Sequence, residues 1–296
     1  VTSANLGSSQ LETSATTLHH NALSFIENKG QWNSNVVFRA PLGTGSVYLE
    51  KNVFTYSQLD PNDIDVAHHH SGEEEKHQKN DYPIDGHAWR TTFIGANSNP
   101  TIQGKEKRTE YHNYILGNDP SKWASHVSLY NEVIYSNLYP SIDLHVYSSN
   151  LNFKYDFIVA PKANADLIQM RFSGLDHLSL KNGNLVCATS IGEFIEKAPY
   201  AYQVINGEQV EVKCEYLLSD QTVSFSFPEG YNKSIELIID PVLVGATLSG
   251  GTVTNFGHCA TYDKDENIYS GARCFGPGYP AEDGSFQTTF GGGVDI

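Results

Sequence analysis

Three side chains in one short stretch of the chain have the chemistry of an acid–base catalyst. Asp143, His145 and Asp156 lie in the sequence LYPSIDLHVYSSNLNFKYDFIVAP, residues 138–161. A pair of carboxyl groups held close together can hydrolyse a glycosidic bond, and an imidazole changes its charge near neutral pH. The stretch therefore raises the question of whether this protein is an enzyme.

The pattern around these residues favours the polar face of a β-hairpin. Side chains alternate along both arms with the period of a strand, and SSNLN at 148–152 turns the chain. The apolar face consists of Ile142, Leu144, Val146, Phe153, Tyr155, Phe157 and Val159. Asp143, His145 and Asp156 then fall on the opposite face, which an antiparallel sheet leaves in water. Because no nucleophile motif accompanies them, we interpret them as surface residues.

A histidine-rich loop is the first candidate metal site. Residues 60–86 are polar and carry His68, His69 and His70, with His77 and three glutamates, Glu73 to Glu75, nearby. Imidazole and carboxylate groups bind zinc, copper or nickel. A stable site also needs fixed ligand geometry, and we expect a mobile surface loop here. Weak metal binding is the alternative to a solvated insertion.

A second candidate lies in DKDEN, residues 263–267. Asp263, Asp265 and Asn267 have the alternate spacing of oxygen ligands in calcium loops. The glycine and the glutamate that complete such a loop at its sixth and twelfth positions are missing. An acidic turn is therefore the favoured interpretation, and calcium is the single cofactor that stays under consideration.

Aromatic side chains are numerous enough to form a sugar-binding row. The candidates are Trp32, Trp89, Trp123, Tyr111, Tyr114, Tyr130, Tyr135 and Tyr139. Large aromatic residues contribute much of the buried area of a β-protein. We therefore expect most of them in the core, and glycan binding is the less favoured alternative.

The four cysteines are predicted to form disulfides. Cys187, Cys214, Cys259 and Cys274 are an even number, as in exported proteins. Three connectivities are open. We favour 187–214 with 259–274, because each pair falls on neighbouring predicted strands.

Composition and turns predict a mostly β protein. Its 17 Tyr and 14 Phe suit half-buried pleated surfaces, and the turns KNGN, INGE and LSDQ mark tight antiparallel hairpins. Few windows have a helical period: DPSKWASH, with Asp119 as a cap, and NADLIQM predict single turns. We therefore expect an antiparallel β-sandwich-type fold. The net charge of −15 argues against nucleic-acid binding, and no apolar run is long enough for membrane insertion.

The chain is predicted to have three parts. Residues 1–21 are a Ser/Thr-rich, flexible lead-in, 22–240 are the β-sandwich-type domain, and 241–296 begin a further repeat; a subdivision near residue 123 is an alternative. The sequence starts with Val1 and not with Met. We interpret this start as the product of signal-peptide removal, so we expect an extracellular or outer-surface location.

Segments in a fixed order carry a resemblance to a known family. They are FIENKGQWNSNVVFRA, GHAWRTTFIGAN, YHNYILGNDPSKWAS, YPSIDLHVY, FKYDFIVAP and ELIIDPVLV. Together they resemble the N-terminal domain that precedes SBBP (seven-bladed β-propeller type) repeats in large secreted proteins of Bacteroidota. The tail from Asn255 is similar to the first such repeat. A propeller blade has four strands and about two are predicted here, so we expect an incomplete repeat.

The resemblance implies a non-enzymatic module at the cell surface. Its expected roles are adhesion, surface architecture or gliding-related display, and the full proteins often end in a type IX secretion sorting domain. The family supplies no catalytic residues. A carbohydrate-binding or carbohydrate-active protein and a calcium-stabilised structural module are the alternatives. Glycans or other surface proteins are the expected partners.

Overall fold

The computed structural model divides the chain into two compact units, residues 1–245 and 246–296, which are described separately. The residues that it describes are 23–61, 63–64, 83–115, 117–149, 152–241, 243–244, 255–262 and 268–274. The predicted lead-in, residues 1–21, and the histidine-rich part of the predicted loop lie outside them. No helix among the described residues is long and apolar enough to cross a membrane.

The first unit is mostly β, as predicted, and its strand pairs are antiparallel. The main sheet runs β15-β14-β18-β9-β8-β7-β1-β2-β3-β4-β5-β10-β17-β16 and is open, so β15 and β16 are edge strands, as is β6, which pairs with β7 alone. Its strands are β1 (Phe25–Glu27), β2 (Phe38–Leu42), β3 (Gly45–Leu49), β4 (Val53–Leu59), β5 (Gly86–Phe93), β6 (Thr101–Tyr114), β7 (Ala124–Tyr139), β8 (Ile142–Ser149), β9 (Asn152–Val159), β10 (Gln169–Ser173), β14 (Tyr200–Ile205), β15 (Glu208–Val212), β16 (Glu215–Ser219), β17 (Thr222–Ser226) and β18 (Leu237–Asp240).

A second, smaller sheet has the order β11-β12-β13-β19. Its strands are β11 (His177–Lys181), β12 (Asn184–Thr189), β13 (Gly192–Glu196) and β19 (Leu243–Val244). The apolar segment ELIIDPVLV contributes strands to both sheets. Pro241 follows β18 directly, and proline lacks the N–H that would continue a strand ladder. The chain therefore leaves the main sheet after β18 and enters the smaller sheet as β19.

The predicted turns are present. Asn182 and Gly183 in KNGN, and Asn206 and Gly207 in INGE, have positive φ angles of 53°, 81°, 55° and 86°, as tight hairpins require. The two predicted helical turns are short 3-10 segments, η3 (Pro120–Lys122) and η4 (Ala165–Leu167). Asp119 caps η3, accepting a hydrogen bond from the backbone N–H of Ser121 at 3.0 Å.

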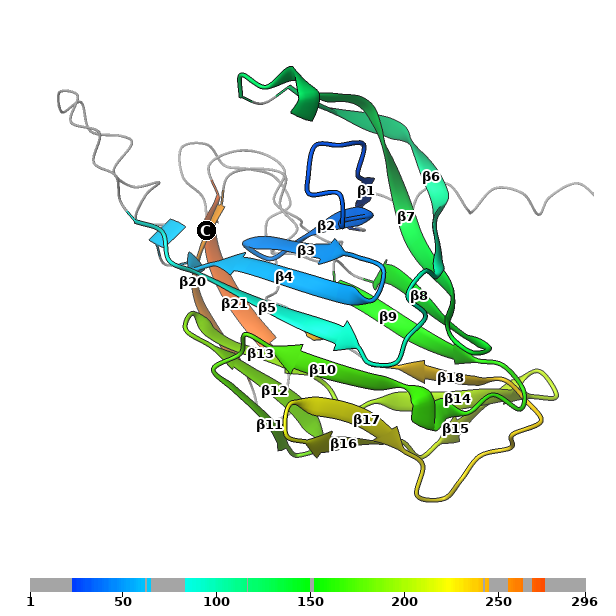
Figure 1. The fold of residues 1–296 in the computed structure, drawn as a ribbon. Helices are drawn as coiled ribbons and strands as arrows, with labels where there is room; N and C mark the ends of the chain where they lie inside the picture. The colour runs from blue at the N-terminus through cyan, green and yellow to red at the C-terminus, as the bar shows by residue number, and fades with distance from the viewer. Residues whose placement is uncertain are drawn as a thin grey trace, which may run out of the picture. The chain divides into compact units, whose positions relative to one another are not determined.

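One continuous sheet bends back on itself to enclose the core (Figure 1). Rings of β9 meet rings of β4, β5 and β17 across the interior, although these strands are far apart in the sheet order. The ring centroids are 5.8 Å apart for Phe54–Phe153, 6.1 Å for Phe93–Phe157 and 5.9 Å for Phe157–Phe225. The alternating apolar residues of β8 and β9 all lie in this core, as predicted.

The β6–β7 hairpin projects beyond the bent sheet (Figure 1). A small apolar cluster of Ile26, Ala124, Val127 and Leu129 fixes it to the N-terminal strands. Trp32 and Tyr114 pack against this cluster, with their ring centroids 5.4 Å apart. The hairpin is therefore attached along its length by side-chain packing.

The second unit contains one antiparallel pair, β20 (Asn255–Tyr262) with β21 (Ile268–Cys274). The register places Cys259 opposite Gly271 and Cys274 opposite Asn255. Positions along a strand are about 3.3 Å apart, which puts the Cα atoms of Cys259 and Cys274 roughly 10 Å or more apart, beyond the reach of a disulfide. The predicted 259–274 pairing does not fit this register.

Candidate functional site

Asp156 forms part of a row of ionisable residues across the outer face of the main sheet. His145 on β8 is paired with Asp156 on β9. On the other side of β9, Ile239 pairs with Phe157, so the next position sets Asp240 of β18 opposite Asp156. Two carboxyl groups directly opposite each other on neighbouring strands repel when both are ionised.

Burial and the neighbouring Asp240 raise the pKa of Asp156 to about 7. The Tyr147 hydroxyl donates a hydrogen bond to Asp156 Oδ1 at 3.2 Å. Lys154 Nζ lies 3.0 Å from Asp240 Oδ2 and balances the charge of that carboxylate. Asp156 can therefore keep its proton at a pH close to neutral.

His145 extends the row toward β7. Its Nε2 atom lies 3.0 Å from Glu132 Oε2, an ion-pair distance, but without the geometry of a hydrogen bond. The imidazole ring lies beside Tyr147, with ring centroids 5.0 Å apart. The His145 and Glu132 side chains are 28% and 30% exposed, and those of Lys154 and Asp240 are 17% and 18% exposed, so the row is partly open to solvent at its β7 end.

Asp143 does not join this row. Its Oδ1 atom accepts a hydrogen bond from the backbone N–H of Asn137 at 2.7 Å. Asn137 has a positive φ of 52° and lies where the β7–β8 register shifts. Asp143 therefore stabilises an irregularity in β7, and the structure brings together only two of the three residues considered as a catalytic cluster.

A hydrogen-bonded serine–histidine pair lies on another part of the surface. His87 Nε2 is 2.6 Å from the carbonyl oxygen of Gly174, so Nε2 donates and Nδ1 is left as an acceptor. Nδ1 accepts from Ser190 twice, from Oγ at 2.9 Å and from the backbone N–H at 3.2 Å. His87 belongs to the main sheet and Ser190 to the β12–β13 turn. The pair therefore connects the two sheets.

Among the described residues, no group of three or more His, Cys, Asp or Glu side chains is arranged to hold a metal ion. The predicted ligands His68, His69 and His70 lie outside the described residues. The acidic turn with Asp263, Asp265 and Asn267 does so as well. Both metal hypotheses therefore stay predictions.

The predicted disulfide between Cys187 and Cys214 is wrong, because both are free thiols. Cys187 is on β12 of the smaller sheet, whereas Cys214 lies in the connection between β15 and β16 of the main sheet. They are not on neighbouring strands, which was the basis of the prediction. Burial raises the pKa of the Cys214 thiol to about 12, and burial also raises the pKa of Cys187, so both are protonated at neutral pH.

The aromatic candidates fall into two groups. Trp89, Tyr135 and Tyr139 are buried in the core, as expected. Tyr111 and Trp123, near the tip of the β6–β7 hairpin, are 52% and 45% exposed. These two are the most exposed members of the candidate set, and one face of the Tyr111 ring is stacked on the His126 ring, with the centroids 4.5 Å apart.

The core contains a buried acid, Glu196, that the sequence pattern did not predict. Glu196, at the end of β13, is only 4% exposed and accepts hydrogen bonds from the hydroxyls of Tyr155 and Tyr216. Burial raises the pKa of Glu196, and the two tyrosine hydrogen bonds partly oppose that shift. Asp240 was missed too, although it ends the apolar run ELIID.

Replacing Asp156 with asparagine is expected to stabilise the protein at alkaline pH. The folded protein keeps the Asp156 proton to about pH 7, whereas an unfolded chain releases it near the ordinary value of 3.8. Wild-type stability should therefore fall as pH rises through this window. The Asp156→Asn variant should gain about 1–2 kcal/mol at pH 8, after discounting for solvent screening, and little at pH 4.

Urea unfolding at several pH values measures this effect. Asp143→Asn is the matched control, because an asparagine there keeps the acceptor for Asn137. Equal dependence of stability on pH in the wild type and in Asp156→Asn would rule out a raised pKa for Asp156.

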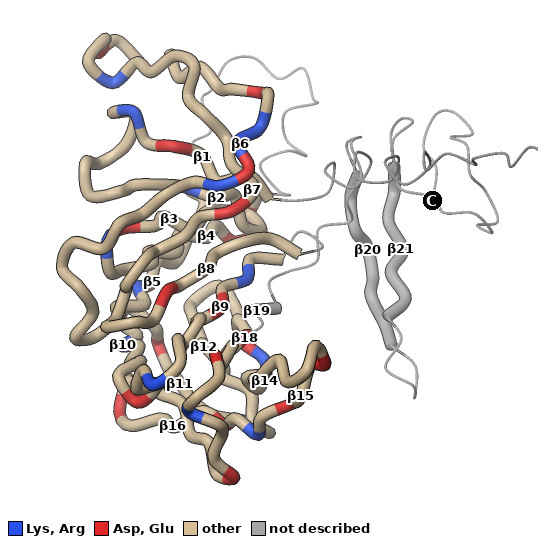
Figure 2. The backbone as a smooth tube through the Cα atoms, turned by 90° about the vertical axis from the view of Figure 1, so that its right-hand side faces the viewer, with Lys and Arg blue, Asp and Glu red and all other residues tan. Residues whose placement is uncertain are grey.

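Charged residues of both signs are interspersed along the strands of the first unit (Figure 2). No curated protein and no solved structure matches the chain. The model of a domain of unknown function, DUF7948, matches residues 25–242. This match covers nearly all of the bent sheet, including the row and the projecting hairpin, and the chain therefore belongs to the DUF7948 family.

Proposed function

We propose that this chain is a non-enzymatic module of a secreted or cell-surface protein, acting in adhesion, surface architecture or gliding-related display. One observation carries the proposal: the element that projects from the bent sheet, the β6–β7 hairpin, ends in exposed apolar side chains. Tyr111, Ile115 and Trp123 are 52%, 64% and 45% exposed. Ile115 and Trp123 take the next positions beyond the Tyr114–Ala124 pair, and neighbouring exposed apolar groups are typical of interaction sites.

The distribution of ionisable groups supports a role in binding over one in catalysis. Asp156, Asp240 and His145 are engaged with their neighbours Tyr147, Lys154 and Glu132 on the outer face of the sheet. An active site normally gathers such groups in a concave, water-excluding pocket. The strand pair β20–β21 is in keeping with the proposal that residues 241–296 begin a propeller-type repeat.

A bead-retention experiment tests the proposed role. Beads coated with the purified chain are passed over surfaces of polysaccharide, mucin and matrix protein, and retention under flow is measured. The double variant Tyr111→Ser/Trp123→Ser should lose most of the retention. Val204→Ser/Val210→Ser is the control, because those valines are 50% and 43% exposed away from the hairpin. Equal loss in both variants, or no retention on any surface, contradicts the proposal.

A carbohydrate-active protein is the second candidate, and the Asp156–Asp240 pair favours it. Burial raises the pKa of Asp156, and a protonated acid beside a second carboxyl group can act as a general acid. Release of reducing sugars from polysaccharides, abolished by Asp156→Asn and by Asp240→Asn, would establish this candidate in place of the first. The calcium hypothesis is separate: a melting temperature that EDTA leaves unchanged would reject it.

A further inference from the structure

The edge strands β11 and β16 leave backbone hydrogen-bonding groups free on the side where they approach each other. β16 ends the main sheet, β11 ends the smaller sheet, and the two strands lie close together. Figure 1 shows them side by side at the same end of the first unit. The two sheets therefore present facing edges that are not joined by a strand ladder.

The register identifies the free backbone groups. The β16–β17 hairpin closes with the pair Ser219–Thr222 around a two-residue turn. In such a hairpin the closing pair is hydrogen-bonded, and so is every second pair beyond it; the residues of the pairs in between point their backbone groups away from the partner strand. Tyr216 and Leu218 therefore direct their N–H and C=O groups to the outer edge. By the same reasoning on the β11–β12 hairpin, Leu178 and Leu180 direct theirs outward from β11.

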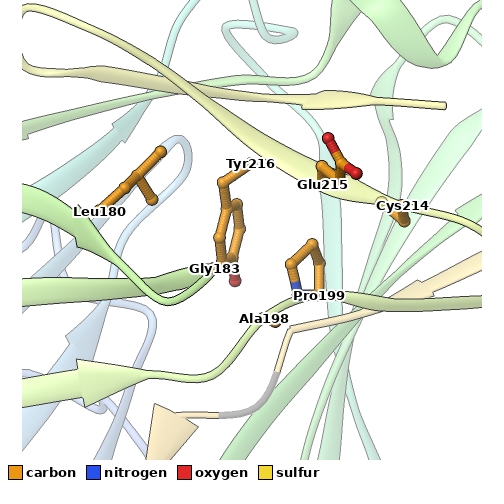
Figure 3. Close-up of a pocket in the computed structure, with 7 residues that line it drawn as sticks. All are labelled: Leu180, Gly183, Ala198, Pro199, Cys214, Glu215 and Tyr216. Carbon is orange, nitrogen blue, oxygen red and sulfur yellow. The ribbon is translucent and has the colours of Figure 1, made fainter. Parts of the chain in front are cut away.

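A pocket of about 210 Å³ lies between these edges. Figure 3 shows Leu180 and Pro199 on opposite sides of the Tyr216 ring. The pocket is lined by Leu180, Gly183, Ala198, Pro199, Cys214, Glu215 and Tyr216. The lining is mainly apolar, and the volume suits one aliphatic side chain.

Exposed apolar and acidic side chains flank the pocket. Leu180 on β11 and Leu217 on β16 are 40% and 52% exposed. The carboxylates of Glu215 and Glu229 share one cation, Lys213, each at 3.8 Å from its Nζ atom. Glu215 and Glu229 therefore give the β16 side of the pocket a net negative charge, whereas the exposed Lys181 and Lys197 adjoin lining residues on the other side.

We propose that the free edge of β16 binds an extended peptide segment of a partner protein by strand addition, with an aliphatic side chain in the pocket and basic residues beside it. Backbone pairing with Tyr216 and Leu218 gives affinity, and the pocket selects the side chain that faces it. Because side chains of a strand alternate between faces, the next residue of the peptide covers Leu217. The carboxylates of Glu215 and Glu229 favour lysine or arginine at the flanking positions. This site is separate from the β6–β7 hairpin and does not depend on its role.

The test uses a short acetylated peptide of alternating lysine and leucine. Amide hydrogen exchange and NMR shifts of the full chain are measured with and without about 1 mM peptide, which detects weak binding. The amides of Tyr216 and Leu218 should exchange at least about tenfold more slowly at saturation. A peptide with glutamate in place of lysine should bind at least about tenfold more weakly.

Two controls separate strand addition from nonspecific attraction. An N-methylated version of the lysine–leucine peptide cannot donate backbone hydrogen bonds, and it should not protect these amides in the unmodified protein. Leu218→Pro removes one outward N–H on an edge, where proline is tolerated, and should weaken binding at least about tenfold. Glu211→Pro, on the opposite edge strand β15, should have no effect. The proposal is overturned if the amides stay unprotected, if the N-methylated peptide binds equally well, or if Glu211→Pro weakens binding as much as Leu218→Pro.

Discussion

Replacing Phe54 with alanine is expected to lower the free energy of unfolding by about 3–5 kcal/mol. Phe54 is 1% exposed and lies between the two halves of the bent sheet. Its ring centroid lies 5.0 to 6.1 Å from those of Phe93, Tyr135, Phe153 and Tyr155. Truncation removes these contacts and leaves a cavity that rigid strands close only in part. Urea unfolding followed by tyrosine fluorescence measures the loss.

Two variants calibrate this expectation. Phe54→Leu keeps most of the volume and should cost only about 1–2 kcal/mol. Leu217→Ala truncates a side chain that is 52% exposed and should stay within about 0.5 kcal/mol of the wild type. If Phe54→Ala costs no more than Leu217→Ala, the packing of β4 against β9 does not hold the bent sheet together.

Local patterns predicted the individual strands and turns well. The alternation in β8 and β9 identified which residues are buried, because one face of each strand packs on the core. The Asn-Gly pairs identified hairpins, because few other residues adopt positive φ at low cost. Both signals depend on neighbouring residues alone.

The candidate site was harder to predict because it depends on pairing between distant strands. Asp156 and Asp240 are neighbours only through the β9–β18 register, and nothing local in either segment specifies that pairing. The disulfide prediction failed for the same reason. Cys187 lies in the smaller sheet, whereas Cys214 lies in a connection between two strands of the main sheet. A single sequence contains no direct signal of such long-range register.

Glu196 shows where even the local pattern misleads. In GEFIEK, hydrophobicity alone would turn Ile195 toward the core and Glu196 toward water. The structure has the reverse: Ile195 is 38% exposed and Glu196 is buried. The hydroxyls of Tyr155 and Tyr216 compensate the buried acid by hydrogen bonding to it. The partner residues come from β9 and β16, so the sequence around Glu196 gives no indication of them.

Replacing Glu196 with leucine is therefore expected to destabilise the protein in spite of the added hydrophobicity. Leucine leaves the Tyr216 hydroxyl without its acceptor and the Tyr155 hydroxyl with only the Met170 sulfur at 3.7 Å, at a cost of about 2–4 kcal/mol in the free energy of unfolding. Glu196→Gln is the matched variant, because its amide oxygen can accept from both hydroxyls without carrying a charge. It should stay within about 1 kcal/mol of the wild type at acidic pH.

The pH dependence separates the charge of Glu196 from its hydrogen bonds. Because burial raises its pKa above the ordinary value of 4.5, the folded protein retains this proton to higher pH than the unfolded chain does. Wild-type stability should therefore decline as pH rises above that value, and Glu196→Gln should remove this part of the decline. The two variants are compared by urea unfolding from pH 4 to pH 8. If Glu196→Leu is as stable as Glu196→Gln throughout, the tyrosine hydroxyls have other acceptors and the buried acid does not organise the contact between β9, β13 and β16.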